Sequence, residues 1–225
     1  MKNIVIVGAG PGLGLALAKK FGENGYRALL VSRTQEKLDA LANELQAIGI
    51  ESKGYAANLY KAEEVKSAFD AIKADYGFID IVEFSPTIDS VPTPATKTTV
   101  ENALQLFDGY VGSAIRVVEQ VLPGMVEKGK GAILFTTGLS ALYPIPMMGN
   151  IGIALAGLRN YVMNLHTDVA DKGVYVAHLS LGMFMKAGTE TDPSVAASAW
   201  YEMVEAREVA EAKYPADVTP ATIIF

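Results

Sequence analysis

Short apolar runs rich in β-branched residues alternate along the chain with longer segments in which apolar positions recur every three or four residues. The short runs predict strands, and several are apolar on consecutive residues, as in strands buried on both faces of a sheet. The longer segments have the periodicity of helices with one buried face. Strands are predicted over 3–7, 27–32, 51–56, 79–84, 131–137, 174–180 and 222–225, and helices over 13–24, 35–48, 63–76, 100–128, 151–171 and 194–213.

This regular alternation of strand and helix predicts the α/β class, with a doubly wound parallel sheet of the Rossmann type. No repeat or linker interrupts the pattern, so we assign one domain to residues 1–225. Residues 85–98, 138–150 and 181–193 are irregular, and each follows the carboxyl end of a strand, where open parallel sheets bind ligands. We expect residues 181–193 to form the substrate loop, with Gly182 and Gly188 as hinges.

Composition narrows the function classes. The formal net charge of −6 argues against nucleic acid as a partner, because phosphate backbones require clustered cationic side chains. The absence of cysteine and the presence of only two histidines predict no metal centre. There is no apolar run of about 18 residues, so we expect no membrane partner and a cytoplasmic location.

The strongest chemical signal is the run Gly8-Ala9-Gly10-Pro11-Gly12-Leu13-Gly14, which lies between the first predicted strand and the first predicted helix. Glycines in that position allow a tight turn and a close approach of the backbone to a pyrophosphate. The start of the following helix presents free N–H groups and the positive end of its dipole to the anion. The run therefore predicts a dinucleotide site.

The residues at the end of the second predicted strand indicate whether the site prefers NADP(H) or NAD(H). A site that prefers NAD(H) places a carboxylate there for the ribose 2′-hydroxyl, whereas this chain has Val31-Ser32-Arg33-Thr34. Arg33 offers a planar, permanently charged fork suited to a 2′-phosphate, which favours NADP(H) over NAD(H). Asn58, after the third predicted strand, is a candidate either for the adenine edge or for capping the next helix.

Along nearly its whole length the chain resembles the short-chain dehydrogenase/reductase family. The spacing Gly8-x-x-x-Gly12-x-Gly14 is that family's glycine pattern, and Val121-Leu122-Pro123-Gly124-Met125 is similar to the end of its fourth helix. Gly182 matches the glycine that follows the family's sixth strand. The resemblance and the residue patterns together give these expected cofactor-binding residues: Gly8, Gly10, Pro11, Gly12, Leu13, Gly14, Ser32, Arg33, Asn58, Leu59, Ser85 and Gly182.

The catalytic residues of the family do not match. Its members use a Tyr-x-x-x-Lys pair with a serine and a supporting asparagine, and the tyrosine hydroxyl is the general acid–base group. Alignment through Ala156-Gly157-Leu158-Arg159 places Ile151 and Leu155 at the tyrosine and lysine positions and Gly138 at the serine. Counting back from Leu122-Pro123 places Tyr110 at the asparagine. None of the ten tyrosines has a lysine four residues later. The usual proton relay is therefore absent.

Other polar residues near the expected cleft are candidate proton donors, namely Tyr110, Tyr143 and Thr137. A tyrosine needs a cationic neighbour to act as an acid near neutral pH, and Arg116, Arg159 and His166 are the nearest in sequence.

Two interpretations remain open. One is an NADP(H)-dependent oxidoreductase with an atypical proton donor and a small-molecule carbonyl or alcohol substrate. The other is a catalytically inactive dinucleotide-binding regulator or redox sensor. The resemblance also implies a homodimer or homotetramer, formed through helices 100–128 and 151–171.

Overall fold

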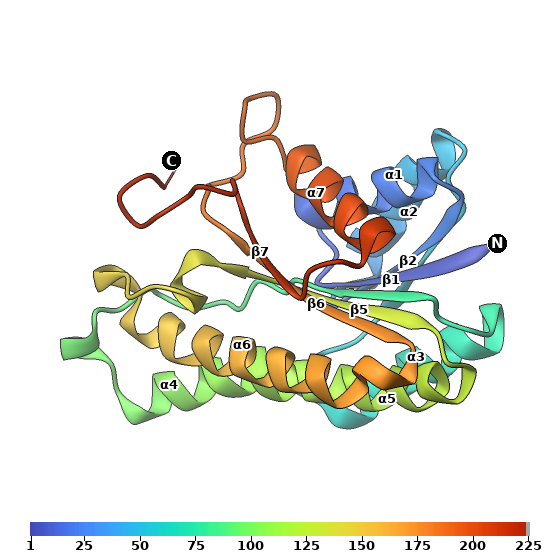
Figure 1. Cartoon of the computed structure of the whole chain (residues 1–225). Coiled ribbons are helices and arrows are strands. Elements are labelled where there is room, and N and C mark those ends of the chain that lie inside the picture. Colours follow the sequence, from blue (N-terminus) through green and yellow to red (C-terminus); the bar gives the residue numbers. More distant parts are fainter. Residues whose placement is uncertain (224–225) are drawn as a thin grey trace.

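Seven strands, all paired in parallel, form one sheet in the computed structural model, which describes residues 1–223 (Figure 1). The sheet has the order β3-β2-β1-β4-β5-β6-β7, so the strand order reverses at β1 and β4, as in a doubly wound sheet. This confirms the predicted fold class. The strands are β1 (Lys2–Val7), β2 (Tyr26–Ser32), β3 (Ser52–Ala56), β4 (Ile81–Phe84), β5 (Gly131–Gly138), β6 (Val174–Leu181) and β7 (Glu211–Tyr214).

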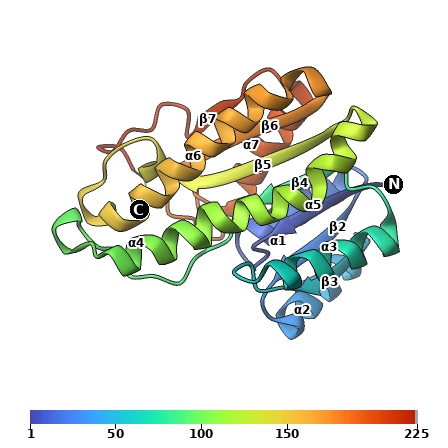
Figure 2. The ribbon, with the colours of Figure 1, turned by 90° about the horizontal axis from the view of Figure 1, so that it is seen from below.

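Helices cover both faces of the sheet (Figures 1 and 2). One face is packed by α1 (Leu13–Glu23), α2 (Gln35–Ala47) and α7 (Pro193–Ala206). The other is packed by α3 (Ala62–Tyr76), α4 (Val100–Phe107), α5 (Ser113–Lys128) and α6 (Gly149–Val169). Short helical turns are η1 (Ala95–Lys97), η2 (Asp108–Gly112), η3 (Leu139–Ala141), η4 (Pro146–Met148) and η5 (Ala170–Lys172). No helix within residues 1–223 is long and apolar enough to cross a membrane.

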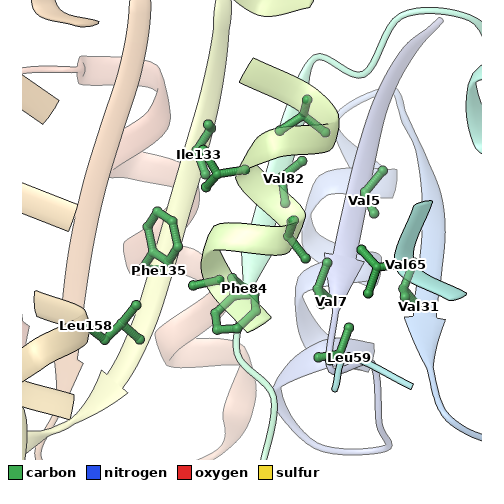
Figure 3. Close-up of a cluster of buried hydrophobic side chains, with 14 of the residues drawn as sticks. Val5, Val7, Val31, Leu59, Val65, Val82, Phe84, Ile133, Phe135 and Leu158 are labelled. Atoms are coloured by element: carbon green, nitrogen blue, oxygen red, sulfur yellow. The ribbon is translucent and has the colours of Figure 1, made fainter. Parts of the chain in front are cut away.

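The strands are apolar on consecutive residues because each face of the sheet has its own core. Along β1, Val5 and Val7 join the cluster beneath α3, α5 and α6, while Ile4 and Ile6 join the cluster beneath α1, α2 and α7. Figure 3 shows the first cluster, in which Phe84 from β4 and neighbouring side chains of β5 and α6 pack together. The two cores hold the carboxyl ends of the strands in one rigid row.

The predicted helix over 100–128 is interrupted. A π-helical turn, Asp108–Gly112, separates α4 from α5, and it brings Tyr110 to the carboxyl edge of the sheet. The turn contacts the segment that follows β3: Ser113 Oγ donates to the Leu59 carbonyl at 3.1 Å, and Gly109 packs beneath Tyr60. Such π turns occur frequently at functional sites.

The predicted helix over 194–213 is wrong at its end. α7 stops at Ala206, where Arg207 adopts a left-handed conformation with φ of 53°, and Glu211–Tyr214 then adds β7 to the edge of the sheet. Pairing with β6 overrides the local helical pattern there. The predicted strand over 222–225 is not formed at residues 222–223, and residues 224–225 lie outside the described residues.

Candidate functional site

The glycine run forms a turn between β1 and α1 that leaves its backbone open. Gly8 has φ of +93°, and a Cβ there would lie 2.4 Å from Pro86 Cα, so only glycine fits. In contrast, a Cβ on Gly12 would meet no atom within 4 Å, and one on Gly10 would meet only the Gly8 carbonyl at 4.0 Å. Both glycines line a cavity, and the start of α1 adjoins it. The turn fits a pyrophosphate held on bare backbone N–H groups.

On one side of this turn a cavity of about 560 Å³ extends over the ends of β2 and β3. Its lining brings together expected cofactor-binding residues from three separate segments: Gly8, Gly10, Pro11, Ser32, Arg33, Asn58 and Leu59. Lys37, from the first turn of α2, also lines it, and the sequence interpretation did not assign that residue a role. Arg33 and Lys37 are both exposed, and neither forms an ion pair with the described residues.

The side chain of Asn58 closes the turn after β3. Its Oδ1 accepts from the backbone N–H of Tyr60 at 3.1 Å, while the backbone N–H of Asn58 donates to Glu64 Oε2 at 2.9 Å. Lys61 is at the N-cap of α3. The capping interpretation of Asn58 is therefore wrong, and its contact with adenine stays a prediction.

On the other side of the glycine turn lies a second cavity, of about 410 Å³, above β4 and β5. It shares Gly8, Gly10 and Pro11 with the first cavity, so the two form a continuous surface along the carboxyl edge of the sheet. Its lining residues include Gly12, Leu13, Gly14, Ser85, Tyr110, Thr136, Thr137, Gly138, Leu155, Leu181, Met183 and Met185. Among these, Leu155 occupies the position where the resemblance implies a lysine.

Gly182 does not line either cavity. A Cβ on Gly182 would lie 2.4 Å from a methyl group of Val218, and its N–H donates to the Tyr214 carbonyl at 2.9 Å. The structure therefore uses this glycine to pack the segment that follows β7. From the same loop, Met183 and Met185 line the second cavity.

The candidate proton donors do not all lie in the same cavity. Tyr110 lines the second cavity, but burial raises the pKa of its phenol, although a hydrogen bond from the Ile88 backbone partly opposes the shift. Tyr143 lies instead in a separate surface cavity with Arg159, Glu211 and Lys213. Lys213 Nζ donates to Tyr143 Oη at 3.3 Å, so its cationic neighbour is one that the sequence interpretation missed.

Thr137, the third candidate, is buried at the end of β5 and lines the second cavity. Its Oγ1 lies 2.7 Å from His178 Nε2 and 3.0 Å from Ser180 Oγ, and it donates to the Gly138 carbonyl at 3.2 Å. Both His178 and Ser180 belong to β6 and are fully buried. Thr137 is therefore part of a polar network that reaches into the sheet.

A second buried network lies beneath the same cavity, on the opposite face of the sheet. Glu83, in the middle of β4, is fully buried, and it accepts from Thr136 Oγ1 at 2.6 Å and from Ser85 Oγ at 2.9 Å. Trp200 Nε1 donates to Thr136 Oγ1 at 2.7 Å. Burial raises the pKa of the Glu83 carboxyl to about 7, although the hydrogen bonds from Thr136 and Ser85 oppose the shift.

Glu83 and His178 were both missed by the sequence interpretation. Each is a titratable residue in the middle of a run predicted to be a buried strand, and that contradiction is a usable signal.

The strand order of the parallel sheet reverses at β1 and β4, and a glycine-rich turn leads into α1 at that point. These two features define the class of dinucleotide-binding Rossmann proteins. The model of the family "short chain dehydrogenase" matches residues 2–196. The chain belongs to this family, which confirms the resemblance.

Individual relatives are distant. Oxidoreductase asL5 of Sarocladium schorii is 30% identical over 179 residues, which cover 80% of this chain and 70% of that protein. The very-long-chain 3-oxoacyl-CoA reductase of Anas platyrhynchos is 28% identical over 181 residues, or 76% of this chain and 56% of the reductase. The chain thus spans little more than half the length of some curated relatives that it matches. L-Sorbose reductase of Gluconobacter frateurii, solved with NADPH and L-sorbose, has the same fold, with a TM-score of 0.85, 21% identity and 94% of each chain covered.

Proposed function

We propose that this chain is an NADP(H)-dependent oxidoreductase that interconverts a carbonyl compound and the corresponding alcohol. The observation that carries the proposal is the continuous pair of cavities on either side of the glycine turn, with Arg33 and Lys37 at one end and polar hydroxyl groups at the other. When bound, the dinucleotide supplies hydride transfer at its nicotinamide ring. Family membership supports the proposal, as do the relatives whose names describe oxidoreductases.

The choice of NADP(H) rests on charge at the end of β2. Arg33 follows Ser32 directly, and Lys37 lies one helical turn further on, so two cations line the same cavity. Asp89 also lines this cavity, but neither cation forms an ion pair with it or with another described carboxylate. A guanidinium can bind a phosphate through two parallel hydrogen bonds, and an ammonium adds a point charge. A ribose 2′-phosphate satisfies both cations, whereas a bare 2′-hydroxyl leaves them unpaired.

The test is a fluorescence titration of the protein with NADPH and with NADH. A charge-assisted hydrogen bond contributes about 1.5–3 kcal/mol, so Arg33→Asp should weaken NADPH binding roughly ten- to a hundredfold and leave NADH binding similar or stronger. Lys97→Asp, which makes the same charge change at an exposed site on η1, is the control. Equal loss in both variants would mean that net charge, not Arg33, determines the preference.

The substrate end of the second cavity is mainly apolar. Leu155, Leu181, Met183 and Met185 line it, and methionines adapt to ligands of different shape. We infer a small-molecule substrate with an apolar group next to its carbonyl, and residues 181–193 as the segment that closes over it. NADPH consumption with a panel of aldehydes, ketones and quinones tests this inference, and a preference for highly polar sugars would contradict it.

A second candidate function is a dinucleotide-binding regulator or redox sensor without turnover. The apolar side chain of Leu155 in the cavity favours it, because leucine cannot lower the pKa of a neighbouring acid or hold a ribose hydroxyl. NADPH binding at micromolar concentrations, together with no NADPH consumption across the panel, is the result that supports this second function over the first.

A homodimer or homotetramer is supported by an apolar stripe on α4. Val100, Leu104 and Phe107 are 70%, 63% and 44% exposed, and they recur at the spacing of one helix face. Ile153 on the adjacent α6 is 52% exposed. Exposed apolar residues that recur along one helix face indicate an interaction surface. We propose that a second copy of this chain covers the stripe.

A further inference from the structure

A line of hydrogen bonds crosses three neighbouring strands beneath the second cavity. Thr137 Oγ1 on β5 lies 2.7 Å from His178 Nε2 on β6, and His178 Nδ1 lies 2.9 Å from Glu211 Oε1 on β7. The first of these residues faces the cavity, and His178 is fully buried. A hydroxyl, an imidazole and a carboxylate in this order and at these distances are the arrangement by which proteins move a proton on and off a hydroxyl oxygen.

Glu211 determines which ring nitrogen carries the proton. The hydrogen bond from His178 lowers the pKa of the Glu211 carboxyl to about 2, and a bond from Arg159 contributes in the same direction against the effect of burial. Arg159 binds both carboxylate oxygens, with Nε–Oε1 and Nη2–Oε2 distances of 2.6 Å. An ionised carboxylate only accepts hydrogen bonds, so His178 Nδ1 must donate. In the neutral ring Nε2 is therefore an acceptor aimed at the hydroxyl of Thr137.

The charged groups around His178 lie on the Nδ1 side of its ring. The charged groups that face the ring are Glu211 on β7 and, behind it, Arg159 on α6, while β5 contributes the uncharged Thr137. A proton on Nε2 is balanced by the carboxylate 2.9 Å from Nδ1. The Thr137 hydroxyl has one proton, which it can donate to Nε2 of the neutral ring or to the Gly138 carbonyl at 3.2 Å; when Nε2 carries a proton, the hydroxyl turns to another acceptor and accepts from Nε2.

Thr137, His178 and Glu211 could supply the proton relay that the chain otherwise lacks. Where the family has its tyrosine and lysine, this chain has Ile151 and Leu155, both buried and without titratable groups. Tyr110 also reaches the cavity, but its phenol bonds to the backbone of Ile88 and not, within residues 1–223, to a titratable side chain that could resupply a proton. Of the three donors considered from the sequence, only Thr137 both lines the cavity and contacts a second proton-carrying side chain.

We propose that Thr137 is the catalytic proton donor and acceptor of the reaction, that His178 supplies its proton, and that Glu211 and Arg159 position His178. The proposal rests on the oxidoreductase function proposed above. In the reductive direction the carbonyl carbon gains a hydride from the reduced nicotinamide, and the C–O double bond becomes a single bond. In this step His178 starts doubly protonated, with Nε2–H donating to Thr137 Oγ1; the substrate oxygen takes the Thr137 hydroxyl proton, Thr137 takes the Nε2 proton, and His178 is left neutral with its proton on Nδ1. His178 regains a proton from water through Thr137 after the product leaves, so one NADPH and one proton are consumed.

The first test needs neither cofactor nor substrate. In protein labelled with ¹⁵N at histidine, only His166 and His178 contribute ring signals, and His166→Gln assigns them. We expect the neutral His178 ring to be protonated at Nδ1, with an Nε2 signal that shifts in Thr137→Val and returns toward its original position in Thr137→Ser. Protonation at Nε2 instead, or an Nε2 signal that ignores Thr137→Val, would overturn the proposal.

The second test separates the relay from the oxidoreductase function. Thr137→Val should lower kcat by about 10²-fold or more, the range of general acid–base catalysis, while the NADPH dissociation constant changes less than twofold. Thr137→Ser should restore most of the activity, and His178→Gln should remove the ionisation that His178 contributes to the pH profile of kcat. Thr167→Val, the same substitution at an exposed site on α6, is the control for threonine replacement.

The outcomes are distinct. Turnover that survives Thr137→Val overturns the relay and leaves the proposed function intact. NADPH binding without turnover on any substrate of the panel overturns both. No NADPH binding overturns the proposed function and, with it, the catalytic role of Thr137, whatever tautomer His178 adopts.

Discussion

Replacing Glu83 with glutamine should change the dependence of stability on pH. Glu83 is fully buried in β4, between β1 and β5, and its carboxyl is contacted by the hydroxyls of Ser85 and Thr136. Burial raises its pKa to about 7, from an ordinary value of 4.5. A shift of about 2.5 pKa units corresponds to about 3 kcal/mol of differential interaction between the two protonation states.

The sign follows from proton binding. Between pH 4.5 and 7 the folded chain holds a proton on Glu83 that the unfolded chain has lost, so the free energy of unfolding falls as pH rises. Above pH 7 the folded chain contains a buried carboxylate, and the loss has reached its full size of about 3 kcal/mol. Glutamine has no ionisation, and its amide can still contact both hydroxyls, so Glu83→Gln should remove this loss.

The assay is urea unfolding at pH 5 and pH 8.5, followed by the fluorescence of Trp200. Trp200 is the one tryptophan of the chain, and it is fully buried with its Nε1 on Thr136, so it reports directly on this network. The difference in unfolding free energy between Glu83→Gln and the parent should increase by about 2.5 kcal/mol from pH 5 to pH 8.5, in favour of the variant, because a small part of the loss has already occurred at pH 5. Glu44→Gln, at an exposed site, should show almost no such change. A difference that is the same at both pH values would refute the buried-carboxyl interpretation.

Three further changes test other parts of the structure. Gly8→Ala should lower the free energy of unfolding by at least about 2 kcal/mol in urea unfolding, because Gly8 has φ of +93° and its Cβ would lie too close to Pro86. Gly10→Ala should change the free energy of unfolding by less than about 0.5 kcal/mol, yet weaken NADPH binding in a fluorescence titration. The opposite order of stability effects would contradict the geometry of the glycine turn. Leu104→Lys should yield a monomer in light scattering if α4 is the interface, and an unchanged mass would place the interface elsewhere. The Glu211 carboxyl has a lowered pKa, so its stabilising contribution is complete above pH 4.5 and is lost as pH falls toward 2. Glu211→Gln should therefore reduce the fall of the thermal unfolding midpoint between pH 4.5 and pH 2. An equal fall in the variant and the parent would argue against a paired carboxylate at Glu211.

The sequence by itself determined the features that depend on short segments. The alternation of strand and helix indicated the parallel sheet, because a strand buried on both faces must be apolar on consecutive residues. The run Gly8–Gly14 indicated the phosphate-binding turn, because strand, turn and helix are contiguous there. Arg33 follows β2 directly, so its place at the cavity also depends on local order. The loss of the tyrosine and lysine pair is likewise a property of one segment, residues 151–155.

Only the tertiary structure decided the features that join distant segments. Thr137 and His178 are 41 residues apart, and His178 and Glu211 are 33 apart, so their contacts depend on strand register. Residues 211–214 continue a helical pattern in the sequence, yet they become β7 because the open edge of β6 offers backbone hydrogen bonds that a helix does not satisfy. The polar network beneath the cavity follows from that pairing, since β7 carries Glu211 to His178. Local pattern reports how one segment can fold, whereas the register between strands decides which polar groups meet.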